Sequence, residues 1–123
     1  MKIRKALLAL TIACLLTACQ PTPVEKHFNV KYLIGEWVEG TVHDKYADDG
    51  TGNTWDTSDD VSEEEATSFE WILSYDTLKV NHLLWNGTIT PKNYIVTVLD
   101  SIQLDNYDLF SGQSHHFTKV TVP

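Results

Sequence analysis

The chain has 123 residues, of which 17 are acidic and nine are basic, so its formal net charge is −8. A chain this acidic is repelled by the phosphates of nucleic acids and by anionic lipid headgroups, which argues against nucleic-acid binding. Its two cysteines both fall within the first 20 residues, so we expect the remainder to fold on a hydrophobic core without a disulfide.

Residues 1–18 have the pattern of a secretory signal peptide. Three basic residues precede an apolar run, 6–16, that is too short to span a bilayer. The run ends in Leu16-Thr17-Ala18-Cys19, which resembles the lipobox of bacterial lipoproteins. The resemblance implies cleavage before Cys19 and attachment of lipid to its thiol. The mature chain then keeps six basic and 17 acidic residues, a net charge of −11.

Residues 19–29 are interpreted as the lipidated cysteine and a short tether that contains two prolines. A single domain is expected over residues 30–123. At its start, Asn29 is a candidate N-cap for one helical turn that ends at Gly35. The alternative is that this segment leads directly into the first strand.

From residue 36 onward the pattern is one of short strands separated by turn residues. The clearest alternation of apolar and polar residues covers 68–75, and Asn86-Gly87 is the strongest hairpin signal. Residues 59–65 are too acidic to pack and are expected to form a solvated loop, and a break is expected at 91–93. The predicted strands cover 37–46, 53–57, 69–75, 78–85, 94–99, 102–109 and 115–122. This pattern predicts an all-β fold of seven or eight short antiparallel strands, as a barrel or a sandwich.

Several motifs occur in an order that resembles a known family. They are Leu33-Ile34-Gly35-Glu36-Trp37, Asp49-Gly50-Thr51-Gly52, Phe69-Glu70-Trp71, Tyr94-Ile95-Val96 and Phe117-Thr118-Lys119-Val120. Together they are similar to the lipocalins, and in particular to the small lipocalin-like domain lipoproteins of Bacteroidetes-type bacteria. The resemblance implies a small up-and-down β-barrel, in which Lys119 replaces the arginine that commonly packs on the tryptophan of the G-x-W motif.

Metal binding and catalysis find little support in the sequence. The acidic residues from Asp56 onward depart from the spacing of a calcium loop. His115 and His116 point to opposite faces of a strand, so they do not chelate together. No nucleophile motif or zinc-binding helix motif occurs. We therefore expect no catalytic residues, no metal and no cofactor, and a protein that is not an enzyme.

Two functions remain open. In the first, the barrel binds a small hydrophobic or glycan ligand, with the aromatic residues Trp55, Trp85, Trp71 and Tyr75 as the candidate contacts. Of these, Trp55 and Trp85 are expected to be exposed at a barrel end. In the second, a filled barrel docks on another envelope protein. In both, the lipid on Cys19 holds the domain in the cell envelope, at the outer membrane, with its periplasmic face favoured over the cell surface.

Overall fold

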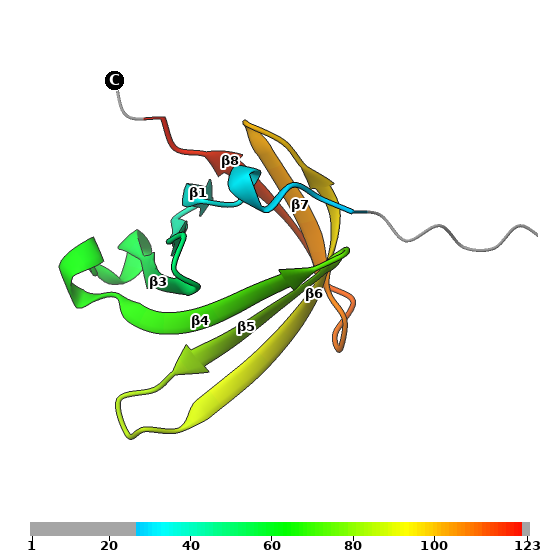
Figure 1. Cartoon of the computed structure of the whole chain (residues 1–123). Helices are drawn as coiled ribbons and strands as arrows, with labels where there is room; N and C mark the ends of the chain where they lie inside the picture. Colours follow the sequence, from blue (N-terminus) through cyan, green and yellow to red (C-terminus); the bar gives the residue numbers. More distant parts are fainter. Residues whose placement is uncertain (1–26, 122–123) are drawn as a thin grey trace, which may run out of the picture.

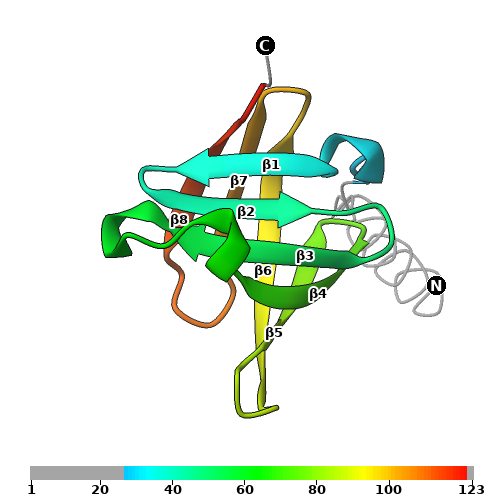
Figure 2. The same ribbon diagram turned by 90° about the vertical axis from the view of Figure 1, so that its left-hand side faces the viewer.

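Each strand pairs with its neighbour in the chain, and the last strand pairs with the first, so eight antiparallel strands close into a barrel (Figures 1 and 2). This computed structural model describes residues 27–121. The strands are β1 (Gly35–Glu39), β2 (Val42–Tyr46), β3 (Thr51–Asp56), β4 (Thr67–Ser74), β5 (Thr77–Leu83), β6 (Ile89–Leu99), β7 (Gln103–Asp108) and β8 (Ser114–Lys119). The expected all-β, up-and-down barrel is thereby confirmed. The predicted signal peptide, Cys19 and most of the tether lie outside the described residues.

The two ends of the barrel differ. At the closed end lie the 3₁₀ helix η1 (Val30–Tyr32) and the turns that join β2 to β3, β4 to β5 and β6 to β7. Asn29 Oδ1 accepts a hydrogen bond from the Lys31 N–H at 3.0 Å, so the predicted helical turn is present. The other end, which we call the mouth, carries the remaining loops. Among them are the 3₁₀ helices η2 (Thr57–Asp59) and η3 (Glu63–Glu65) within the acidic segment, which is largely exposed as expected.

Two predicted boundaries are wrong. The single strand expected over 37–46 is two strands, because Gly40 has a φ of +59° and turns the chain at Gly40-Thr41. The break expected at 91–93 is absent, since β6 runs through Pro91. There β6 pairs with β5, whereas β7 pairs with it only from Tyr94 onward. A proline is tolerated where one side of a strand has no ladder.

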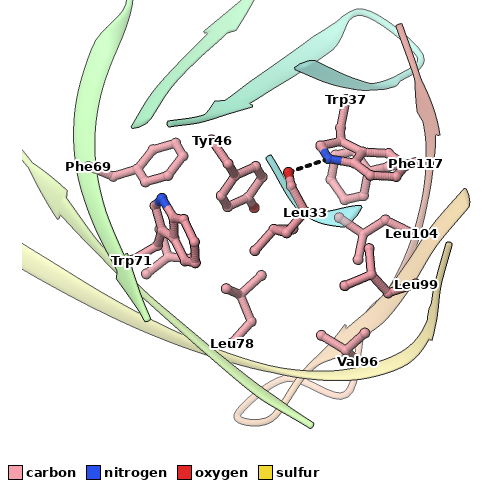
Figure 3. Packing of buried hydrophobic residues seen from close by; sticks show 11 residues of the cluster. Leu33, Trp37, Tyr46, Phe69, Trp71, Leu78, Val96, Leu99, Leu104 and Phe117 are labelled. Atoms are coloured by element: carbon pink, nitrogen blue, oxygen red, sulfur yellow. Dashed lines mark hydrogen bonds between the residues drawn. The ribbon is translucent and has the colours of Figure 1, made fainter. Parts of the chain in front are cut away.

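Inward-facing side chains fill the closed half of the barrel (Figure 3). Leu33, which follows η1, is fully buried, and its side chain lies among the other core side chains inside the barrel. Trp37 donates from its Nε1 to the Leu33 carbonyl oxygen at 2.9 Å, and the ammonium of Lys119 lies 4.6 Å from the centre of its ring. The expected contact between Lys119 and Trp37 is therefore present, and Trp37, Phe69, Trp71 and Phe117 are core residues.

The seam between β1 and β8 is the shortest in the barrel. Only Trp37 with Lys119 and Val38 with Thr118 are paired there. Toward the mouth the Glu39 side chain extends the seam: its Oε2 accepts from the His116 backbone N–H at 2.6 Å, and its Oε1 lies 2.8 Å from His115 Nδ1. A side chain thus continues the closure where the main-chain ladder stops.

Within residues 27–121 no helix is long and apolar enough to cross a bilayer.

Candidate functional site

The mouth half of the barrel is not filled. A cavity of about 190 Å³ lies above the apolar core. Its lining combines aromatic and aliphatic side chains with acidic, amide and imidazole groups: Glu39, Val42, Asp44, Tyr46, Thr54, Phe69, Val80, His82, Tyr94, Asn106, His115 and Phe117. Every strand contributes to the apolar core or to this lining by the same alternation, in which every second residue faces inward. On β1 and β2 this alternation brings Glu39 and Asp44 into the cavity.

Asp44 is the most perturbed acid of this cavity. Burial raises the pKa of its carboxyl group, and the charge of Glu39 raises it further. A hydrogen bond with Thr54 and the nearby His115 and His43 act in the opposite direction. Within the described residues Asp44 forms no ion pair. The desolvation penalty of its carboxylate is therefore not offset by an ion pair within the described residues.

The pKa values of the two tyrosines in the cavity are affected by the same nearby negative charges. Burial raises the pKa of Tyr94 to about 12, and the charges of Asp44 and Asp108 add to that effect. The pKa of Tyr46 is also raised well above its ordinary value, by burial first and by Asp44 second. Both hydroxyls stay neutral at physiological pH and are available as hydrogen-bond donors or acceptors.

The positive groups nearby are few and already engaged. His115 is held by Glu39, and Lys92, which is half-exposed, lies 3.8 Å from Asp108. The pKa of His82 is lowered, by burial and then by Lys92, so its ring is neutral at pH 7. The cavity as a whole is therefore acidic.

Asn106 adds an unsatisfied acceptor. It is 4% exposed, faces inward from β7, and its Oδ1 has no hydrogen-bond partner. Its neighbour Asp105 faces outward, where Oδ2 accepts from Gln103 at 2.7 Å, and Oδ1 lies 2.9 Å from His116 Nδ1 without the geometry of a hydrogen bond. Buried acceptors are nearly always paired in native proteins. Asn106 is thus poised for a donor that the protein itself does not supply.

The four aromatic residues predicted to contact a ligand are not brought together. Trp71 is 8% exposed in the closed half, where its Nε1 donates to the Thr51 carbonyl oxygen at 2.9 Å. Tyr75 lies in the β4–β5 turn at the closed end, 4.3 Å from the ring of His27. None of the four lines the cavity.

Trp55 and Trp85 lie on the mouth side but differ in exposure. Trp85, at the tip of the β5–β6 hairpin, is 97% exposed, as predicted. The expected exposure of Trp55 is wrong, since only 8% of it is accessible. It faces outward from β3, stacks on His43 with ring centres 5.1 Å apart, and is bordered by the acidic segment that carries η3. The segment expected to be free in solvent therefore covers a tryptophan.

The mouth has an apolar rim made by two neighbouring loops. Phe110 in the β7–β8 loop is fully exposed, and its neighbour Leu109 is more than half-exposed. The Leu109 N–H donates to the Asn93 carbonyl oxygen of β6 at 2.9 Å, which fixes this loop against the base of the β5–β6 hairpin. The β5–β6 hairpin also exposes Trp85 and Ile89, and these two together with Leu109 and Phe110 are what we call the apolar rim.

A metal centre finds no support in the part of the chain that is described. No group of three His, Cys, Asp or Glu side chains there is arranged to hold an ion. His115 faces the cavity and His116 faces outward with 75% of its side chain exposed, as their adjacency predicts. The sequence contains one indication of the cavity. Val42, Asp44 and Tyr46 are every second residue of one strand and so face the same side of the sheet. If Tyr46 is assigned to the core, Asp44 must face inward as well.

A comparison of the chain with known protein families, curated proteins and solved structures finds no match. The class that the fold defines is a small closed antiparallel β-barrel with an acidic cavity at one end. What this barrel does has to be argued from the cavity and its rim.

Proposed function

We propose that this chain is a lipid-anchored lipoprotein of the cell envelope whose lipocalin-like barrel binds a small ligand at its mouth. The observation that carries the proposal is the unfilled mouth half of a barrel whose other half is closely packed. An interior that serves stability alone is expected to be filled, because voids forfeit packing energy. The ordered motifs and the lipobox support the family and the anchor.

The size and chemistry of the cavity limit the kinds of ligand that it can hold. At about 190 Å³ it is smaller than the ~300–1,000 Å³ typical of sites for drug-sized molecules. Its wall carries Asp44, Asn106 and His115, which are costly to desolvate against an alkyl chain. A short polar ligand, or the end of a glycan, therefore suits the cavity better than a long fatty acid. We propose no catalytic role and no cofactor.

Ligand binding is tested by calorimetry and thermal unfolding with the full-length chain in detergent. The panel contains short sugars, short alcohols, short amines and a fatty acid. A saturable heat with a rise in melting temperature is expected for a polar member. Val80→Phe, which places a ring in the cavity from β5, is expected to abolish the response. The control Asn81→Phe places the same ring on the outer wall and is expected to preserve it. A flat response to the whole panel would contradict the proposal.

The anchor has a separate test. Cys19→Ser is expected to remove the lipid mass and release the protein from the membrane fraction, because acyl chains contribute ~0.8 kcal/mol per buried CH₂ and the acidic domain contributes no attraction to anionic lipids. Retention of the variant in the membrane, or absence of lipid on the wild type, would contradict the assignment. The outer membrane, with the domain in the periplasm, is the proposed location.

A second candidate function is docking on another envelope protein, favoured by the apolar rim. Trp85 and Phe110 are 97% and 100% exposed on neighbouring loops, and exposed aromatic residues are frequent anchors of interfaces. The paired change Trp85→Ser and Phe110→Ser is expected to remove a crosslinked partner in cells while melting temperature stays unchanged. Identical crosslinking patterns would contradict a docking role for the rim.

A further inference from the structure

The rings in the cavity form one half of a recognition surface. Phe69, Tyr46, Tyr94 and Phe117 enter the cavity from four different strands. Faces of aromatic rings carry partial negative charge, and cages of such rings attract ammonium groups. Because both tyrosines remain neutral, they act here as aromatic rings and not as anions.

The polar part of the surface comes from strands that are consecutive around the barrel, β7, β8, β1 and β2, two of which also carry Phe117 and Tyr46. Their contributions are Asn106, His115, Glu39 and Asp44 in that order. Glu39 is occupied by its bonds to His115 and His116. Asp44 has no ion-pair partner within residues 27–121, so a negative charge at the cavity wall is left for something else to neutralise.

Asn106 points independently to a donor in the cavity. It is 4% exposed and its Oδ1 lacks a hydrogen-bond partner. The other inward residues of β7 differ from it: Leu104 is apolar and buried, and Asp108 Oδ1 accepts from the backbone N–H groups of Phe110 and Ser111. An unpaired buried oxygen costs free energy that a ligand N–H would recover. A carboxylate and an amide oxygen together select a ligand that is both cationic and a hydrogen-bond donor.

The volume limits the ligand to a few atoms. At ~30 Å³ per water in the liquid, 190 Å³ corresponds to roughly six waters. An ammonium group on a short alkyl chain fits that space. Its nitrogen can meet Asp44 and Asn106, and its methylenes can lie against Phe69 and Phe117.

We propose that the cavity binds a small organic ammonium ion, held by Asp44 and Asn106 and by the aromatic rings that line the same space. This inference rests on the proposed ligand-binding function of the barrel and names the chemical class of its ligand. Neutral ligands of the same shape are excluded from strong binding because they leave the Asp44 carboxylate desolvated and unpaired.

The test uses butylammonium and its neutral counterpart 1-butanol, titrated calorimetrically into the full-length chain in detergent at one fixed ionic strength. Butylammonium is expected to bind at least about tenfold more tightly than 1-butanol, which is the discrimination of one charge-assisted hydrogen bond. Asp44→Asn is expected to weaken butylammonium binding about tenfold or more. Asn106→Leu, which keeps the shape and removes the acceptor, is expected to weaken it several-fold.

Glu70→Gln is the matched control, since it removes one negative charge from the exposed outer face of β4. It is expected to leave affinity within about twofold. Melting temperatures of all variants, measured alongside, establish that each is folded. Equal binding of 1-butanol, or equal affinity of Asp44→Asn and wild type, would overturn the ammonium inference and leave the ligand-binding function standing. If no sugar, alcohol, amine or fatty acid binds, both fall.

Discussion

Trp37 connects three parts of the closed end through one side chain. Its ring is fully buried, its Nε1 bonds the Leu33 carbonyl oxygen, and Lys119 lies over its face. The Lys119 ammonium also donates to the Tyr32 carbonyl oxygen at 3.2 Å and to that of Ile34. Burial lowers the pKa of Lys119 from its ordinary value of 10.5. Because that ordinary pKa is far above 7, the ammonium stays charged at neutral pH.

Trp37→Phe is expected to lower the free energy of unfolding by about 1–3 kcal/mol, because the Leu33 carbonyl oxygen is left buried without its donor. Urea denaturation measures this change. Trp85→Phe makes the same substitution at a 97% exposed site and is expected to stay within about 0.5 kcal/mol. Equal effects of the two substitutions would contradict the role assigned to the buried hydrogen bond.

Asp44 has the opposite energetic character, since its charge opposes folding. Its folded pKa is raised above the ordinary value of 3.8, so the folded protein binds more protons than the unfolded chain. The stability associated with the protonated form is fully present below pH 3.8 and is lost as the pH rises through the folded pKa. The groups that act on its pKa, Glu39, Thr54, His115 and His43, set how far that window extends.

Asp44→Asn is therefore expected to raise the melting temperature at pH 7, because the amide avoids the desolvation of a charge and still accepts the Thr54 bond. The gain is expected to shrink as the pH falls and to be smallest below 3.8. Melting curves between pH 3 and 7 measure it. A variant less stable than the wild type at pH 7 would show that the carboxylate is compensated. A more stable variant that has lost ligand binding is the usual signature of a residue kept for function.

At the scale of elements, the weak point is the seam between β1 and β8. Glu39 supplies two hydrogen bonds beyond the two paired positions of that ladder. Glu39→Ala is expected to cost about 1–3 kcal/mol, since hydrogen bonds to a carboxylate are lost and the His116 N–H is left unpaired. Amide hydrogen exchange is expected to accelerate in β8 before the other strands.

Glu36→Ala is the control for that change. Glu36 faces outward on the same strand and contacts only His43 Nδ1, at 3.2 Å, among its side-chain partners in the described residues. This pair is part-buried on the outer face, and surface pairs contribute about 0–1 kcal/mol. Uniform acceleration of exchange around the barrel in Glu39→Ala would indicate a global loss of stability and contradict a local seam.

The elements themselves were largely predictable because their signals are local. Alternation around Phe69 and Trp71 and the turn at Asn86-Gly87 require only neighbours in the chain, and both are present. The turn at Gly40-Thr41 was missed because the residues on either side are strand formers. The break at Pro91 was wrongly expected because its tolerance depends on where β7 begins to pair, which is a property of the sheet.

The cavity was harder to predict for a physical reason. Whether a barrel interior is filled depends on the summed volumes of residues far apart in the chain, such as Asp44, Val80 and Asn106. Their inward orientation follows from alternation, but the empty space between them does not. The covered position of Trp55 likewise depends on how the acidic segment folds back, and no local signal marks it.

At the scale of the whole molecule, the chain enters the barrel at the closed end. The His27 ring packs on Tyr75 in the β4–β5 turn, and η1 follows immediately. The β5–β6 hairpin projects on the other side of the barrel, at the bottom of Figure 2, and Trp85 belongs to its loop. Between Cys19 and His27 there are eight residue steps, which reach at most about 29 Å. In the proposed lipid-anchored form, a lipid on Cys19 would therefore hold the closed end near the bilayer and leave the mouth directed away from it.

This orientation predicts different distances from the lipid for labels at the two ends. In the lipidated protein the thiol of Cys19 is occupied, so Ser101→Cys in the β6–β7 turn and Asn86→Cys in the β5–β6 hairpin each give one reactive site; both positions are exposed. With nitroxide headgroups in the vesicles, a fluorophore at 101 is expected to be quenched more strongly than one at 86. Because the acidic domain is repelled by anionic headgroups, vesicles containing anionic lipid are expected to reduce quenching at both positions and preserve their order. Stronger quenching at 86 would place the apolar rim in the bilayer. The mouth would then be a membrane contact, and a ligand would have to enter it from the lipid side.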